Sequence, residues 1–162
     1  STLHLAGALF AQQAGVNLVH VPYRGNGPAI TDVSGGQGQA IFSGIPPAIT
    51  SAKTGQTRIL AVTTKQRVKN LPNVPTVAEA GLPGYAFTSW YGLFTTGGTD
   101  PAIVERLAQE VRKIMERPEV QAQFEAQGLD PETSDPKSFK QQIDRELTRW
   151  SRDVKTMGIT AD

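Results

Sequence analysis

Short apolar segments alternate with helix signals through the first half of the chain, and this alternation constrains the fold more than any other feature. Residues 17–22, 39–43 and 58–63 are apolar-rich runs of strand length. Residues 28–33 and 46–54 separate them, each beginning with proline, which favours the first turn of a helix, and each followed by a glycine-containing end signal. This order predicts an α/β fold with a mostly parallel sheet flanked by helices.

The second half of the chain has a different pattern. Residues 65–84 form a connection with several prolines and glycines, and it leads into residues 85–96, which are strand-like but long for one strand. Gly92 interrupts them, so we expect a strand that crosses from one sheet to another. The remainder predicts a C-terminal helical segment with apolar side chains at spacings of three and four. The stripe of its last helix is Phe139, Ile143, Leu147, Trp150 and Val154.

The composition excludes several classes of function. The chain has 162 residues and no cysteine, which rules out disulfides, zinc–thiolate sites and thiol nucleophiles. Its formal net charge of +1, without a run of like charges, argues against a nucleic-acid partner.

The loop at residues 25–27 (Gly-Asn-Gly) precedes the helix that begins at Pro28. Glycines let a ligand approach the backbone, and helix N-termini attract carboxylate or phosphate. Two interpretations of this loop fit the sequence equally well: a site that binds an anion, and a tight turn that binds no ligand. A dinucleotide site is disfavoured, because the third glycine of its fingerprint is missing and Ser43 stands near the end of the next strand in place of an acidic residue.

Three expected helix starts carry hydroxyl or glycine residues, at residues 1–2, 25–27 and 43–44. The loops that follow parallel strands lie at one edge of a sheet, where their N–H groups and hydroxyls could surround a carboxylate. Taken singly, ordinary N-capping is the simpler explanation of each of them.

No catalytic constellation stands out, and we predict no catalytic residue, no metal ligand and no cofactor. Ser43 lacks the G-x-S-x-G context, since Ile41 occupies the place of the first glycine. His4 and His20 do not have metal-ligand spacing, and no carboxylate lies near either in sequence. An α/β enzyme domain that acts on a small anionic substrate is the alternative to a binding protein without chemistry.

Two long segments resemble a known family. HLAGALFAQQAGVNLVHVPYRGNGPAITDVSGGQGQAIF and LAVTTKQRVKNLPNVPTVAEAGLPGYAFTSWYGLF are similar to the signatures of the substrate-binding receptors of tripartite tricarboxylate transporters, the Bug-type extracytoplasmic solute receptors. The resemblance runs over essentially the whole chain. One departure is Phe42-Ser43-Gly44, where Phe-Asp-Asn is frequent, and we expect it to alter the choice of ligand.

The resemblance implies a two-lobed, periplasmic-binding-protein-like fold that captures a small organic carboxylate in the periplasm and presents it to membrane transporter subunits. It implies that residues 1–96 form the second lobe, with the crossing strand at 85–96. Residues 97–162 would be helices that pack on the first lobe. That lobe and a leader peptide are expected to lie outside this sequence, so we expect self-association through the unsupported helices.

The resemblance also implies a ligand site at the three helix starts. At positions 25–29, backbone amides are expected to matter more than side chains. The resemblance places Trp90 near the crossing strand. There its side chain could belong to the core or line the wall of the pocket. The expected ligand contacts are Ser1, Thr2, His4, Gly25, Asn26, Gly27, Ala29, Ser43 and Trp90.

Overall fold

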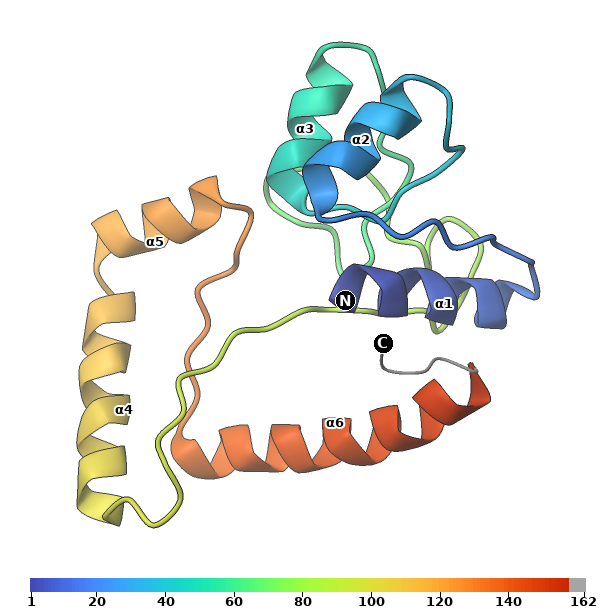
Figure 1. The fold of residues 1–162 in the computed structure, drawn as a ribbon. Helices are drawn as coiled ribbons and strands as arrows, with labels where there is room; N and C mark the ends of the chain where they lie inside the picture. The colour runs from blue at the N-terminus through green and yellow to red at the C-terminus, as the bar shows by residue number, and fades with distance from the viewer. Residues whose placement is uncertain (158–162) are drawn as a thin grey trace. The chain divides into compact units, whose positions relative to one another are not determined.

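The computed structural model describes residues 1–157, and within them the regular secondary structure is helical (Figure 1). The chain divides into two compact units, Ser1–Trp90 and Tyr91–Asp162. The division falls inside residues 85–96, for which a single crossing strand was expected.

The first unit contains α1 (Thr2–Ala14), α2 (Asn26–Ser34) and α3 (Ile45–Lys53). The Ser1 hydroxyl accepts a hydrogen bond from the backbone N–H of His4 over 3.4 Å and caps α1. Gly15 ends the helix with φ at 65°, a left-handed conformation that favours glycine. Helices α2 and α3 pack against each other (Figure 1).

The core of the first unit forms where α1 meets residues from the later connection. Tyr85 is 1% exposed, and its hydroxyl donates a hydrogen bond to the Ala6 carbonyl over 2.9 Å. Phe10 places its ring at an edge-to-face angle to Tyr85 and in a tilted arrangement with Phe42. The buried hydrophobic residues of the described chain are Ala6, Leu9, Val62, Val77, Tyr85 and Phe87.

The expected parallel sheet is not confirmed. Residues 17–22, 39–43, 58–63 and 85–96 are not assigned to strands, and the described residues contain one isolated parallel bridge, between Val62 and Thr76. A helix satisfies its backbone groups within one segment, whereas a strand needs an aligned neighbour about 4.8 Å away. Apart from that bridge, these segments have no ladder of hydrogen bonds between neighbouring strands. Apolar side chains that a sheet would cover are therefore exposed, and Val19 is 85% exposed.

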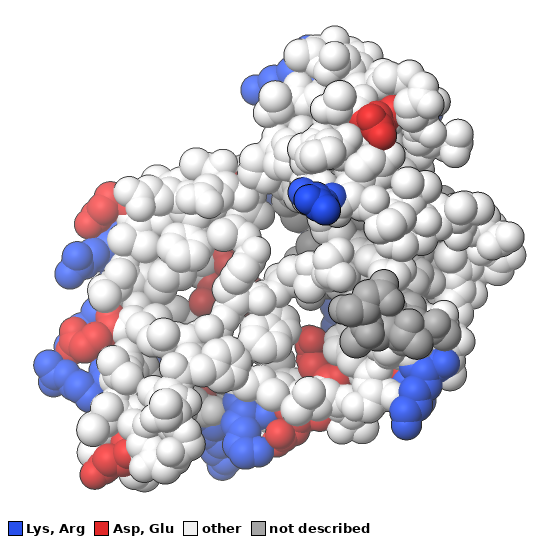
Figure 2. All heavy atoms as spheres, viewed as in Figure 1, with Lys and Arg blue, Asp and Glu red and all other residues white. Residues whose placement is uncertain are grey.

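The second unit contains α4 (Pro101–Met115), α5 (Pro118–Ala126) and α6 (Pro136–Thr156). Asp100 and Asp135 cap α4 and α6 by accepting backbone N–H hydrogen bonds over 2.8 and 3.0 Å. Helix α4 contacts both α5 and α6. Figure 2 shows basic and acidic side chains interspersed over α4 and α6.

Apolar side chains of the second unit are only partly covered. No residue of α4, α5 or α6 is buried, and Ile103 and Leu147 are 55% and 61% exposed. Within residues 1–157, no helix combines the length and apolar character that crossing a membrane requires.

Candidate functional site

The starts of α2 and α3 are joined directly. The side-chain amide of Asn26, the first residue of α2, donates a hydrogen bond from Nδ2 to Oγ of Ser43 over 2.9 Å. The Ser43 hydroxyl donates in turn to the Gly44 carbonyl over 3.1 Å, one residue before α3. Two of the three loops that the sequence singled out therefore meet, and both present helix N-termini at the meeting point.

The third loop is connected to the other two through its helix. A Cβ atom added to Gly7 in α1 would lie 3.1 Å from Cδ2 of Phe42, so α1 passes close to the residue before Ser43. At the first turn of α1, the imidazole of His4 stacks on that of His20, with ring centroids 3.8 Å apart and planes 5° from parallel. This stack connects α1 to the segment that leads into the glycine loop.

The glycine loop has the open backbone that an anion site needs. Gly25 has φ at 110°, a conformation that side chains rarely adopt, whereas Gly27 lies in the helical region. A Cβ atom at either glycine would have no protein atom within 4 Å. Ala29 is only partly buried on the first turns of the same helix. A small ligand can therefore approach the first turn of α2 without displacing protein atoms.

The electrostatics of the three helix starts favour an anion. None of α1, α2 and α3 carries an acidic residue in its first turn, so no local carboxylate offsets the partial positive charge there. Tyr23 fastens the loop to its helix, because its hydroxyl donates to Oδ2 of Asp32 over 2.7 Å. That hydrogen bond raises the pKa of Tyr23 and occupies an oxygen of the nearest acidic side chain on α2.

The Asn26 side chain shows an imperfectly satisfied contact at this meeting point. Its Oδ1 atom is buried and accepts no hydrogen bond from the described residues. Buried polar atoms of this kind are normally paired with ordered water or a ligand.

The structure joins Ser43 to the loop and first turn of α2, which carry Gly25, Asn26, Gly27 and Ala29. Ser1 and Thr2 open α1 one turn from His4, whose ring is engaged by His20. Trp90 is half-buried at the end of the first unit, and the contacts above do not involve it.

Sequence analysis considered His20 only as a metal ligand or catalytic group, and it did not single out Gly7. Gly7 had a signal, since glycine inside a helix is unfavourable unless another group approaches closely. His20 had none, because a ring stack between residues 16 positions apart leaves no local pattern. In the part of the chain that the structure describes, no three His, Cys, Asp or Glu side chains gather into a possible metal site.

A family model described as the tripartite tricarboxylate transporter family receptor matches residues 1–159. The chain belongs to this family. Among the curated relatives, a UPF0065 protein of a Pseudomonas species is 35% identical over 163 residues, covering 100% of the chain and 48% of the relative. The protein BugT of Bordetella pertussis is 32% identical, covering 98% of the chain and 48% of the relative.

Several solved structures share the fold of this chain. An R. palustris protein solved with adipate is 32% identical with a TM-score of 0.84, and the match covers 99% of the chain and 54% of that protein. MatC from Rhodopseudomonas palustris, solved with malate, is 27% identical with a TM-score of 0.73, covering 95% and 53%. Another structural relative is a TctC solute binding protein from Polaromonas, so the fold is that of periplasmic-binding-protein-like receptors. The chain spans about half the length of these relatives.

Proposed function

We propose that this chain is the carboxylate-gripping part of an extracytoplasmic solute receptor. The Asn26–Ser43 hydrogen bond carries the proposal, since it brings the N-termini of α2 and α3 to one place beside an open glycine loop. Backbone N–H groups and hydroxyls at such a place hold a carboxylate by hydrogen bonds and helix dipoles. Such binding requires no chemical step.

The ligand class is a small organic acid with one or more carboxylates. Two of the structural relatives were solved with dicarboxylates, one with adipate, which has six carbons, and one with malate, which has four. The loops of this chain offer uncharged donors, and Arg24 is the one charged side chain next to the glycine loop. A dicarboxylate would place one carboxylate on α2 and α3 and leave the other for a separate contact.

Residues 1–96 would act as the second lobe of the receptor and residues 97–162 as helices that support the complete molecule. The receptor would work in the periplasm and deliver its acid to the membrane subunits of a tripartite tricarboxylate transporter. The partly exposed apolar side chains of α4 and α6 support the expectation that another protein surface covers them, and a second copy of the chain is the partner we propose for the isolated chain.

Isothermal titration with matched acids tests the proposal. We expect saturable binding of at least one acid from a panel of acetate, succinate, malate, adipate and citrate, and none of the corresponding uncharged amides. The same panel should be titrated into the product of the complete natural gene. Failure of every acid with both proteins, or equal binding of an acid and its amide, would refute a carboxylate receptor.

A further inference from the structure

The charged residues of the chain are divided unevenly between its two compact units. Residues 1–90 contain six Lys and Arg residues but only two acidic residues, whereas residues 91–162 contain ten Lys and Arg residues and thirteen acidic ones. The first unit, which carries the proposed carboxylate site, is therefore positively charged, and a positively charged surface raises the local concentration of anions.

Both acidic side chains of the first unit are engaged. Oδ2 of Asp32 accepts a hydrogen bond from the Tyr23 hydroxyl over 2.7 Å. Oε2 of Glu79 accepts one from Nε of Arg67 over 2.9 Å. Within residues 1–157, the exposed side chain of Arg24 has no ion-pair or hydrogen-bond partner. The positive charge of Arg24 is therefore available to an anion from solution.

Arg24 also adjoins the meeting point of two helix starts. It directly precedes Gly25, the N-cap of α2, and the next residue, Asn26, is bonded to Ser43 before α3. The chain between the guanidinium and the start of α2 is a single glycine, at which a Cβ atom would have no protein atom within 4 Å. A ligand held at the start of α2 therefore lies next to a residue with a full positive charge.

The other cationic side chains of the first unit belong to different segments. Lys53 is the last residue of α3, about 12 Å along the helix axis from its first residue. Arg58 follows Thr57, whose hydroxyl donates to Ser51 near the end of α3. The remaining three cationic residues lie at positions 65–69, in the later connection.

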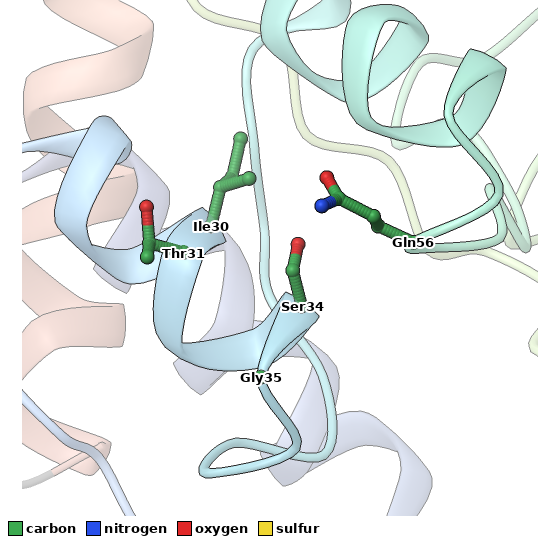
Figure 3. A pocket seen from close by; sticks show the side chains of 5 residues that line it. All are labelled: Ile30, Thr31, Ser34, Gly35 and Gln56. Carbon is green, nitrogen blue, oxygen red and sulfur yellow. The ribbon is translucent and has the colours of Figure 1, made fainter.

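The opposite end of α2 offers no positive charge to a ligand. The hollow there is lined by the uncharged residues Ile30, Thr31, Ser34, Gly35 and Gln56 (Figure 3). Helix C-termini carry partial negative charge, which repels a carboxylate. The two ends of α2 therefore differ in what they offer to an acid, and a second carboxylate is favoured only at the end that carries Arg24.

Charge balance limits what the two helix starts can hold by themselves. Each helix N-terminus acts as about half a positive charge, so α2 and α3 together offset about one carboxylate. A second carboxylate on the same ligand needs a further positive charge, and a guanidinium supplies it in a planar form that binds both carboxylate oxygens. We propose that Arg24 binds this second carboxylate and makes the site selective for dicarboxylates over monocarboxylates, an assignment that rests on the proposed function.

Titration calorimetry with diacids and their monoamides measures this selectivity. Succinate and succinamate, or adipate and its monoamide, have the same chain length and differ in the second charge. Each pair should be titrated into the chain and into the product of the complete natural gene. Because Arg24 is exposed, we expect the diacid to bind about fivefold more tightly than its monoamide at low ionic strength. In 1 M salt, where the Debye length is about 3 Å, this preference should fall below about twofold.

Arg24→Gln is the decisive variant, because it removes the charge and keeps a polar side chain. It should bind the diacid about fivefold more weakly and bind the monoamide as the unaltered chain does. Arg24→Lys keeps the charge without the planar group and should retain part of the preference. Arg58→Gln is the matched control, since it removes the same charge from an exposed position of the same unit, and it should keep the full preference.

The outcomes separate this assignment from the proposed function. An unchanged ratio of diacid to monoamide affinity in Arg24→Gln, or an equal loss in Arg58→Gln, would overturn the role of Arg24 and leave the carboxylate receptor intact. A lack of preference in the unaltered chain and in the complete gene product would do the same. If neither a diacid nor a monoamide binds either protein, the proposed function fails, and the assignment of Arg24 fails with it.

Discussion

The side-chain amide of Asn26 donates a hydrogen bond to the hydroxyl of Ser43 over 2.9 Å, across 17 positions of sequence, and fastens the start of α2 to the start of α3. This contact brings together two helix N-termini that sequence alone places in separate loops. If the site binds a carboxylate, the affinity for that ligand should depend on two properties of the Asn26 side chain: it is uncharged, and its amide group donates the hydrogen bond to Ser43.

We therefore predict that Asn26→Asp weakens carboxylate binding at least about tenfold, equivalent to about 1.4 kcal/mol. The new carboxylate cannot donate to Ser43 and repels the ligand, although negative charge at a helix start favours the helix itself. Isothermal titration with the best acid of the panel measures the change. Asn73→Asp, at an exposed position of the later connection, adds the same charge and should bind normally. Equal affinities of the two variants would place the ligand elsewhere.

Gly27→Val should reduce carboxylate binding. The added side chain enters space that no protein atom occupies within 4 Å, although Pro28 follows and a residue with a Cβ atom is disfavoured in the helical conformation directly before a proline. We expect a loss of most of the binding signal together with a slightly lower thermal midpoint. Gly97→Val is the control, since its Cβ also meets open space, in the second unit. Normal affinity in the Gly27 variant would count against the glycine loop as the site.

Tyr85 should make the stability of the chain fall at alkaline pH. Burial raises the pKa of Tyr85 from 10.0 to about 12, so the folded state resists deprotonation more strongly than the unfolded state. The stabilisation is complete below pH 10, and it is lost as the pH rises toward 12. Tyr85→Phe should lower the unfolding free energy by about 1 kcal/mol at neutral pH, through loss of the hydrogen bond to Ala6, and should flatten the alkaline decline.

Urea unfolding between pH 8 and pH 11.5 measures this effect. Tyr91→Phe is the control, because Tyr91 is 83% exposed and its removal should leave the profile unchanged. Parallel profiles for the unaltered chain and the Tyr85 variant would show that Tyr85 does not cause the alkaline loss.

Gly92→Ala should destabilise the second unit. A Cβ atom at position 92 would collide with Cζ of Phe139 and lie 2.9 Å from its Cε1, and the ring is held by a tilted contact with Phe94 at 5.5 Å between centroids. Overpacking of this kind costs about 1–3 kcal/mol, and Phe139→Leu in the same chain should restore part of it. Chemical denaturation measures both variants. Gly97→Ala, in open space, should be neutral, and a neutral Gly92 variant would show that the Phe139 ring moves aside freely.

Sedimentation velocity at rising concentration should show self-association of the isolated chain. Leu147 lies on the apolar stripe of α6 and is 61% exposed, so Leu147→Lys should shift the population to monomers. Val19→Lys, at an exposed position in the first unit, should have a smaller effect. A single monomeric species of the unaltered chain at high concentration would contradict the proposal.

The helices of the C-terminal segment could be read from the sequence because their signals are local. Asp100 before Pro101 and Asp135 before Pro136 supply a cap and a favourable first residue, and the structure begins α4 and α6 at those prolines. The same holds for the start of α1 after Ser1 and its end at Gly15. Each of these signals acts within about one turn of helix.

The expected sheet is not confirmed, and its signals are not local. A strand is stabilised by a neighbouring strand that is often remote in sequence. Apolar runs such as residues 17–22 indicate a preference for extended structure, but they do not specify the strand with which they would pair. The structure pairs Val62 with Thr76 and leaves the other expected strands without a ladder. The predicted fold class is nevertheless that of the structural relatives, which extend to about twice the length of this chain.

The sequence by itself determined where most helices start and stop, the position of the glycine loop and the family to which the chain belongs. Only the tertiary structure decided that Asn26 reaches Ser43, that His20 stacks on His4 and that Phe139 lies against Gly92. The physical reason is that caps and turns depend on neighbouring residues, whereas these contacts depend on how the chain returns on itself.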